Sequence, residues 1–160
     1  MFVFISILIF SVIGFFIHLY YDKEPRTKPR IIELLFLYQL VFSVGLTSVL
    51  AFFALSLIPE YIANFTGWPS SPFEQQLANV NLAFAVLGIL CIWFRGLFWT
   101  ATALGFSVWI FSDGLAHISN MIKENNYTPG NIGVPLYTDL LVPAVLIILL
   151  VMHHWNPKNG

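Results

Sequence analysis

Five apolar runs, each long enough to cross a lipid bilayer, dominate this sequence. A helix needs roughly 20 apolar residues to span the hydrocarbon core, because every backbone N–H in lipid must be paired within its own segment. The runs cover residues 2–21, 31–58, 73–94, 97–122 and 136–155. The sequence therefore predicts an all-α, polytopic membrane protein: a compact bundle of five transmembrane helices that forms one domain, residues 1–160.

The shortage of charged residues excludes several classes of protein. Only 9% of the residues are charged, whereas about 25% is usual in soluble domains. A chain this poor in Lys and Arg offers no basic patch for a phosphate backbone, so we expect no nucleic acid among its partners. A single cysteine, Cys91, excludes a disulfide framework within the chain. The lipid bilayer is the first partner that this composition predicts.

Basic residues indicate how the five spans are oriented. Lys and Arg in short loops stay on the cytoplasmic side, and six of the seven lie in the first loop, the third loop and the C-terminal tail: Lys23, Arg26, Lys28, Arg30, Arg95 and Lys158. We therefore expect the N-terminus outside and the C-terminus in the cytoplasm, in a bacterial cytoplasmic membrane. The first run has no basic n-region, so we interpret it as a permanent span. Trp93, Trp99 and Trp155 would then form an inner aromatic belt, with Trp68 at the outer interface.

The third and fourth runs are separated only by Arg95 and Gly96. So short a connection predicts a tight antiparallel helical hairpin. Both helices rise about 1.5 Å per residue, so counting outward from this turn places Glu74 level with His117.

Polar residues near the outer ends of the two hairpin helices form the candidate site. Asp113 and His117 are four residues apart on the fourth run, so they share one side of a helix. A carboxylate inside a membrane is costly, which makes Asp113 a functional-site hypothesis by default. The expected ligand-binding residues are Glu74, Gln75, Asn79, Asp113, His117 and Asn120.

Acidic groups and a histidine are also the ligand types that suit a divalent cation. The candidate metal ligands are Glu74, Asp113, His117 and Asp139, although the sequence contains no H-E-x-x-H motif and no cysteine set. His18 and His153 lie at similar depth in principle, but interfacial rings of this kind usually face headgroups. Haem is therefore not expected.

Each polar residue also has a structural interpretation. Glu74 could complete an S-x-x-E capping box with Ser71. His117 could be an interfacial imidazole paired with a neighbour, and Asp113 could join helices through hydrogen bonds alone. The N-x-T triplets at Asn64 and Asn126 fall on the predicted outer side, where we interpret them as chance matches.

Several segments between Trp68 and Pro143 carry a family resemblance. They read GWPSSPFEQQLANVNLAFAVLGIL, FRGLFWTATALG, DGLAHI and NYTPGNIG. In these segments the chain resembles an uncharacterised family of small multi-pass membrane proteins, a domain of unknown function. The resemblance implies a compact helical bundle and brings no known activity with it.

The functional hypothesis is a non-enzymatic membrane protein whose outer-half polar pocket binds a small ligand, a lipid or quinone, or a cation. The main alternative is an accessory or assembly subunit of a larger membrane complex, or a homo-oligomeric transporter, in which the polar residues serve only helix packing. A membrane enzyme is less well supported, because no nucleophile with a base and an orienting group is recognisable.

Overall fold

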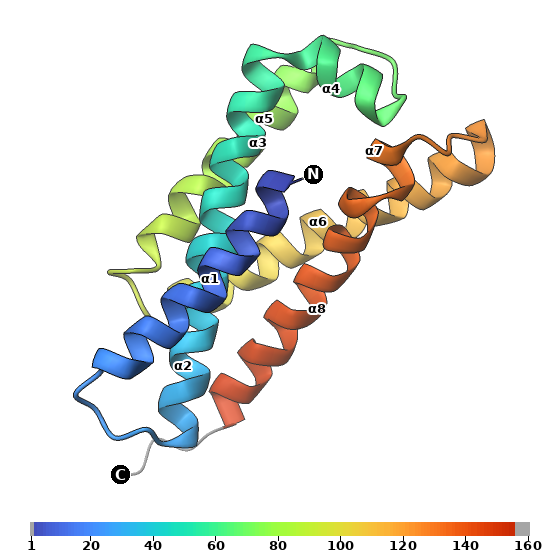
Figure 1. Ribbon diagram of the computed structural model, residues 1–160. Helices are drawn as coiled ribbons and strands as arrows, with labels where there is room; N and C mark the ends of the chain where they lie inside the picture. The colour runs from blue at the N-terminus through green and yellow to red at the C-terminus, as the bar shows by residue number, and fades with distance from the viewer. Residues whose placement is uncertain (1, 156–160) are drawn as a thin grey trace.

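The computed structural model describes residues 2–155, with side chains from Ser6 onward, and this part of the chain is helical without any strand. The all-α prediction is confirmed. The elements, in chain order, are α1 (Phe2–Tyr21), α2 (Lys28–Tyr38), η1 (Gln39–Leu46), α3 (Thr47–Leu57), α4 (Pro59–Thr66), α5 (Phe73–Leu90), α6 (Leu97–Glu124), α7 (Pro129–Ile132) and α8 (Val134–Trp155) (Figure 1).

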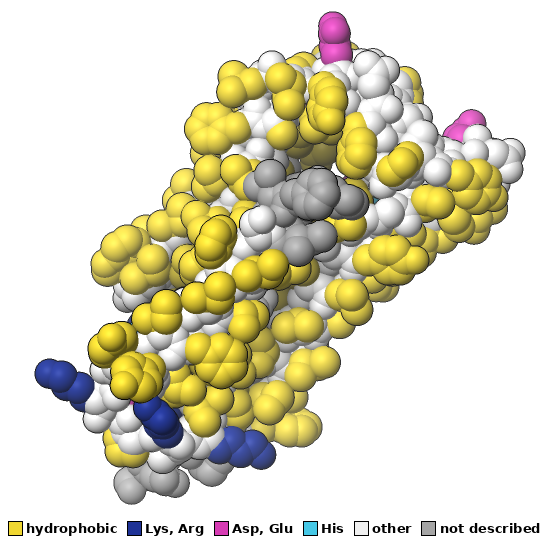
Figure 2. Space-filling model, in the orientation of Figure 1, with side chains coloured by type: hydrophobic (Ala, Val, Ile, Leu, Met, Phe, Trp, Pro, Cys, Tyr) yellow, Lys and Arg dark blue, Asp and Glu magenta, His cyan; other side chains and the backbone are white. Residues whose placement is uncertain are grey.

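Long helical segments run back and forth between two ends of the molecule (Figure 1). One end, called here the basic end, contains the loop 22–27 and the turn 91–96. The opposite end, called the cap end, contains the short helices α4 and α7. Lys and Arg side chains gather at the basic end in Figure 2, and the surface between the two ends is mainly hydrophobic.

Two of the helical segments are long and apolar enough to cross a membrane. They are Lys28–Leu57, formed by α2, η1 and α3, and Pro129–Trp155, formed by α7 and α8. They match the predicted runs 31–58 and 136–155 closely. A shorter apolar stretch lies at Ser6–Tyr21 within α1.

The middle of the long helix, η1, is a π-helix. Its wider turns bury three consecutive residues, Ser43, Val44 and Gly45. Gly45 lies against Gly88 of α5, and a Cβ atom built on Gly88 would lie 2.6 Å from the Cα atom of Gly45. Only two glycines allow the helix backbones to approach so closely, which fixes α5 against this segment.

The hydrophobic core joins α2 and η1 to α6 and α8. Its largest fully buried side chain is Trp99, whose ring packs edge-on against Phe36 and whose Nε1–H donates to the carbonyl oxygen of Cys91 at 2.8 Å. The prediction that Trp99 belongs to an interfacial belt is therefore wrong, because its indole nitrogen finds a backbone partner inside the protein. Trp93 and Trp155 are exposed near the basic end, as predicted.

The predicted hairpin is observed only in its half nearer the turn, where the ring of Phe84 on α5 stacks on that of Trp109 on α6 with centroids 5.1 Å apart. α5 ends at Leu90, and a turn of several residues leads through Gly96, at φ +65°, into α6. From there α5 runs beside α3 while α6 runs beside α8, and the two diverge toward the cap end (Figure 1). The physical reason is that each helix packs better on another partner: α5 through the Gly45 and Gly88 contact, and α6 along α8.

An ion-pair network ties the basic end together. Nε of Arg30 donates to Asp22 at 2.7 Å and its Nη1 donates to Glu33 at 3.0 Å, while Nη1 of Arg95 lies 3.5 Å from Glu33. The hydrogen bond from Arg30 lowers the pKa of Asp22. Arg95 also lies over the ring of Trp99, 4.7 Å from its centroid. Ion pairs through Glu33 thus link the first loop to the turn between α5 and α6.

Candidate functional site

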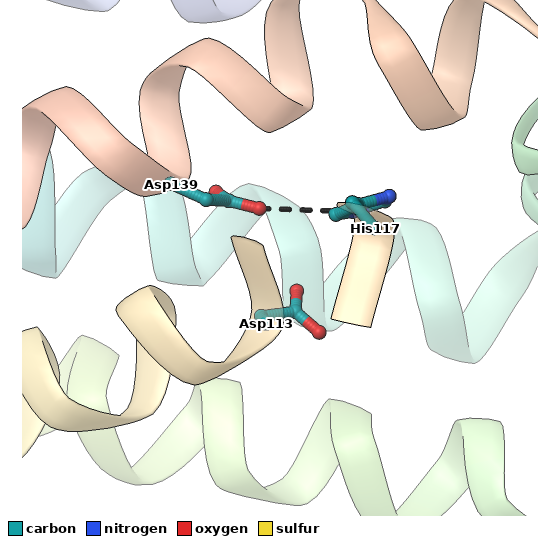
Figure 3. Close-up of side chains that lie close together, drawn as sticks. All are labelled: Asp113, His117 and Asp139. Atoms are coloured by element: carbon teal, nitrogen blue, oxygen red, sulfur yellow. Dashed lines mark ion pairs between the residues drawn. The ribbon is translucent and has the colours of Figure 1, made fainter. Parts of the chain in front are cut away.

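Three ionisable side chains meet where α6 packs against α8. Asp113 and His117 come from successive turns of α6, and Asp139 comes from the first half of α8 (Figure 3). One ligand atom from each lies within 4.8 Å of the others, and His117 Nε2 is 3.7 Å from Asp139 Oδ2. We call this group the triad. The sequence predicted the pair on α6 and included Asp139 among the metal candidates.

A glycine allows the two helices to meet at the triad. Gly114 is buried on α6, and a Cβ atom built there would lie 3.2 Å from Cβ of Asp139 and 3.1 Å from Cδ2 of Leu140. A side chain at this position would press on Asp139 and Leu140, which would have to shift by a few tenths of an ångström. The close contact therefore depends on the absence of a side chain at this position.

His117 is held from the other side by Asn131 of α7. The imidazole Nδ1 lies 2.8 Å from Asn131 Oδ1, and both residues are buried. Trp68, whose ring packs on the imidazole with centroids 5.5 Å apart, donates its Nε1–H to the same Oδ1 at 2.8 Å. The amide nitrogen of Asn131 donates to the backbone oxygens of His117, at 3.2 Å, and Asn126, at 2.9 Å.

These contacts show that Nδ1 of the imidazole carries a hydrogen. The indole N–H of Trp68 is only a donor, so the Asn131 atom that it contacts must be the amide oxygen. An oxygen cannot donate, so His117 Nδ1 carries the hydrogen in this bond. The other ring nitrogen, Nε2, then faces the carboxylates and makes no hydrogen bond with any residue from 2 to 155. In the neutral ring it presents a lone pair to two acidic groups.

The cap end positions Asn131. Asn126 Nδ2 donates to the carbonyl oxygen of Thr66, at 2.8 Å, and to Asn120 Oδ1, at 2.7 Å. The hydroxyl of Thr128 donates to the same Thr66 oxygen at 2.7 Å. The segment after α6 is therefore bound to the end of α4, which brings both Trp68 and Asn131 over His117. Asn120 supports this cap and does not enter the triad.

The residues predicted at the start of the third span lie elsewhere. Glu74 accepts a hydrogen bond from Ser70 at 3.4 Å, and Gln75 donates to Asn79 at 3.2 Å and to Ser56 at 3.5 Å. The start of α5 lies beside α3 and α4, away from the far half of α6 (Figure 1). The divergence of α5 from α6 thus leaves Glu74, which the sequence placed level with His117, outside the triad.

The prediction of a capping box at the start of α5 is also wrong in detail. Ser71 Oγ accepts from the backbone N–H of Phe73 at 3.3 Å, so it does not bond the N–H of Glu74, which instead donates to the Ser71 carbonyl oxygen at 3.1 Å. Pro72 occupies the cap position, without a side-chain hydrogen bond. The proline displaces the helix start by one residue relative to the box.

Two residues that hold His117 were not predicted as part of the site. Asn131 lies in the segment NYTPGNIG, where Asn and Gly residues indicate only a turn. Trp68 was predicted as an interfacial residue, and its indole does lie at the cap end. A sequence signal for either role is absent, because both depend on how α4 and α7 dock across a long separation in the chain.

The remaining histidines and asparagines have their own surroundings. Tyr38 Oη lies 3.3 Å from His18 Nδ1, and the ring of His153 packs near Phe36 and Trp99 at the basic end. Asn64 is exposed on α4. The Asn126 amide nitrogen uses both of its hydrogens in hydrogen bonds, one of which a glycan would replace.

Comparison with known proteins identifies the family. Residues 1–159 match a family of unknown function, DUF6790, so the chain belongs to this family. No curated protein and no solved structure matches the chain. The resemblance to an uncharacterised family is thereby confirmed over almost the whole chain, beyond the segments from Trp68 to Pro143 that first indicated it.

Proposed function

We propose that this member of a family of unknown function is a five-pass integral membrane protein that binds a small cation in a buried polar site in its outer half. The observation that carries the proposal is the orientation of His117. Its Nδ1 is bonded to Asn131, so its Nε2 is directed at the carboxylates of Asp139 and Asp113.

The membrane assignment is supported by where the apolar surface lies. In the most apolar part of the helices Lys28–Leu57 and Pro129–Trp155, only 28% and 22% of the residues are buried. The core helix of a soluble protein would bury most of such a stretch. Large apolar side chains are also exposed on α1, α6 and α8, including Phe10, Phe16, Val108, Ile122, Leu141 and Ile148. Lipid is the environment that such a surface suits.

The charge distribution supports five crossings. α1, the α2–η1–α3 helix, α5, α6 and α8 alternate in direction between the basic end and the cap end (Figure 1). The basic end holds the loop with Lys23 and Arg26 and the turn with Arg95, as a cytoplasmic face would. The cap end, and the triad near it, then belong to the outer half.

A positive charge is the missing partner of the triad. Two carboxylates and an imidazole lone pair repel one another, and the repulsion grows as the surroundings become less polar. No described Lys or Arg is paired with Asp113 or Asp139. A buried acidic group in a membrane is stable only when it is paired, protonated or bound to a cation. The site is therefore best suited to a cation.

An organic ligand is a weaker candidate than an ion. A shallow pocket at the cap end has a volume of about 250 Å³ and is lined by Trp68, Ala116, Ser119, Asn120, Lys123 and Glu124. None of these residues is a member of the triad. The carboxylates instead lie beside His117 where α6 packs against α8, and three such donor groups suit an ion better than a quinone or a headgroup.

The topology is tested with single cysteines. Cys91→Ala removes the native thiol, after which Glu24→Cys at the basic end and Glu60→Cys on α4 provide exposed labelling sites. In sealed right-side-out vesicles, a membrane-impermeant maleimide should label Glu60→Cys alone and label Glu24→Cys only after the vesicles are opened. Labelling of both positions in sealed vesicles would contradict the five-pass arrangement.

Cation binding is tested on the full chain purified in detergent without chelators. Thermal unfolding is measured with NaCl, KCl, MgCl₂, CaCl₂, MnCl₂ and ZnCl₂. At least one cation should raise the Tm of the native protein and lose this effect in the variant Asp113→Asn with His117→Gln. Glu124→Gln, an exposed acid at the same end, is the matched control and should respond like the native protein.

A different result would favour the accessory-subunit alternative. If the double variant unfolds at a lower temperature and no cation affects either protein, the triad serves helix packing, and cation binding is refuted.

A further inference from the structure

We infer that the cation is a divalent transition metal ion, held by Nε2 of His117 together with the carboxylates of Asp113 and Asp139. This inference rests on the proposed function and names the class of ion that the same site selects. One donor atom from each of the three residues lies within 4.8 Å of the others. Bonds of about 2.0–2.2 Å to nitrogen and oxygen would draw these atoms closer together around the ion.

The donor atoms select among cations. Ca²⁺ and Mg²⁺ prefer oxygen ligands throughout. An imidazole nitrogen favours zinc, iron, nickel and copper, while carboxylates also suit manganese. One nitrogen with two carboxylates therefore matches the borderline ions Mn²⁺, Fe²⁺ and Zn²⁺. Monovalent copper is disfavoured, because it prefers thiolate and thioether ligands and the triad has no sulfur.

Charge favours a divalent ion over a monovalent one. Asp113 and Asp139 contribute two negative charges, and His117 contributes none when its Nε2 is a ligand. A sodium ion or a single proton leaves one negative charge in the helix contact, whereas a divalent ion neutralises both. Uncompensated charge is costly at a site whose side chains are 8% and 14% exposed, for His117 and Asp139.

The surroundings of His117 are those of a metal ligand. Metal-binding histidines usually donate their second ring N–H to a carbonyl or carboxylate, which fixes the ring and raises its basicity as a ligand. Asn131 Oδ1 accepts this hydrogen, and Trp68 holds the same oxygen in place. Asn131 and Trp68 are therefore positioning residues, which act on the ion only through the imidazole.

The test uses Mn²⁺ as the probe, because bound and free Mn²⁺ differ in their electron paramagnetic resonance spectra. The full chain in detergent should bind one Mn²⁺, which Zn²⁺ displaces, and spin-echo modulation should reveal coupling to an imidazole ¹⁴N. His117→Gln should abolish the ¹⁴N coupling. Asp139→Asn should weaken binding at least 10-fold, and Asn131→Ala should weaken it by about 10–100-fold. His154→Gln at the basic end is the matched control and should leave binding and coupling unchanged.

The possible outcomes separate this inference from the proposed function. If Na⁺, K⁺, Mg²⁺ or Ca²⁺ raises the Tm through Asp113 and His117 while Mn²⁺ and Zn²⁺ do not bind, the transition-metal inference is wrong and the proposed function stands. If no cation binds, both are wrong. Binding of Mn²⁺ with unchanged ¹⁴N coupling in His117→Gln would also overturn the inference. The spectrum of the folded native protein decides the case even if a variant fails to fold.

Discussion

Gly45 in η1 and Gly88 in α5 bring two helix backbones into direct contact. A Cβ atom built on Gly88 would overlap the backbone nitrogen of Gly45 and would lie 2.8 Å from the carbonyl oxygen of Leu40. These atoms belong to the backbone, so no side-chain rotation can relieve the overlap. The contact therefore sets the distance between α5 and the long helix.

Replacing Gly88 by alanine should separate these helices. We expect Gly88→Ala to lower the free energy of unfolding by about 2–3 kcal/mol, because overpacking against a backbone forces the helices apart. Unfolding in mixed detergent micelles, followed by circular dichroism, measures the change. The control is Gly105→Ala, where the new Cβ would lie 3.7 Å from the ring of Phe84. Gly105→Ala should be neutral or slightly stabilising, since alanine favours helix. Equal stability of the two variants would contradict the proposed contact.

Asn131 should be the most sensitive residue of the cap end. Asn131→Leu removes an acceptor from Trp68 and His117 and leaves the carbonyl oxygens of His117 and Asn126 without their donor. Each buried polar group left unpaired costs about 1–3 kcal/mol. The two donors, Trp68 and His117, alone give an expected loss of roughly 2–6 kcal/mol, measured by the same unfolding assay. Asn64→Leu on the exposed face of α4 is the control. A small loss for Asn131→Leu would mean that water replaces the amide.

Trp99 should stabilise the basic end through its indole nitrogen as well as its size. Trp99→Phe keeps an aromatic ring but removes the donor that bonds the carbonyl oxygen of Cys91 at 2.8 Å. We expect the free energy of unfolding to fall by about 1–3 kcal/mol, because a buried carbonyl is left unpaired. Trp155→Phe, at a position that is 82% exposed, should cost little. If both variants lose the same stability, the hydrogen bond contributes nothing measurable.

The ion pair between Asp22 and Arg30 should make stability depend on acid pH. Arg30 lowers the pKa of Asp22 in the folded protein below its ordinary value near 3.8. The pair therefore stabilises the fold fully above about pH 4, and this stabilisation is lost as pH falls through the folded-state pKa. Thermal unfolding between pH 6 and pH 2.5 should show this loss in the native protein.

The variant Asp22→Asn isolates that contribution. It should be less stable than the native protein near pH 6 and should approach it at the lowest pH. Glu24→Gln, an exposed neighbour, is the control and should retain the native pH dependence. A constant difference between Asp22→Asn and the native protein at every pH would rule out titration of this pair.

Much of the fold could be predicted from the sequence because long apolar runs leave few alternatives in lipid. The runs 31–58 and 136–155 correspond to observed helices, since their length and composition alone favour them. The spacing of Asp113 and His117 placed both on one side of α6, since a helix has a fixed period. These predictions depend on local rules.

The predictions that failed concern partners across the fold. Glu74 was placed level with His117 on the assumption that a short connection makes neighbours of two helices. Instead, the close approach of Gly45 and Gly88 packs α5 against the long helix formed by α2, η1 and α3. The role of Asn131 could not be predicted either, because it depends on α7 docking to Thr66 of α4. Helical period says which side a residue faces and does not say which helix it faces.

The divergence of α5 from α6 also affects the lipids around the protein. α6 and α8 diverge from α3 and α5 toward the cap end, so the bundle is wider there than at the basic end (Figure 1). In the proposed orientation, with the cap end outside, this wedge would displace more lipid from the outer leaflet than from the inner one. Neighbouring acyl chains would then have to tilt to fill the space beside its narrower end. A membrane that bulges toward the outer side would fit this shape better than a flat one if the chain is oriented as proposed.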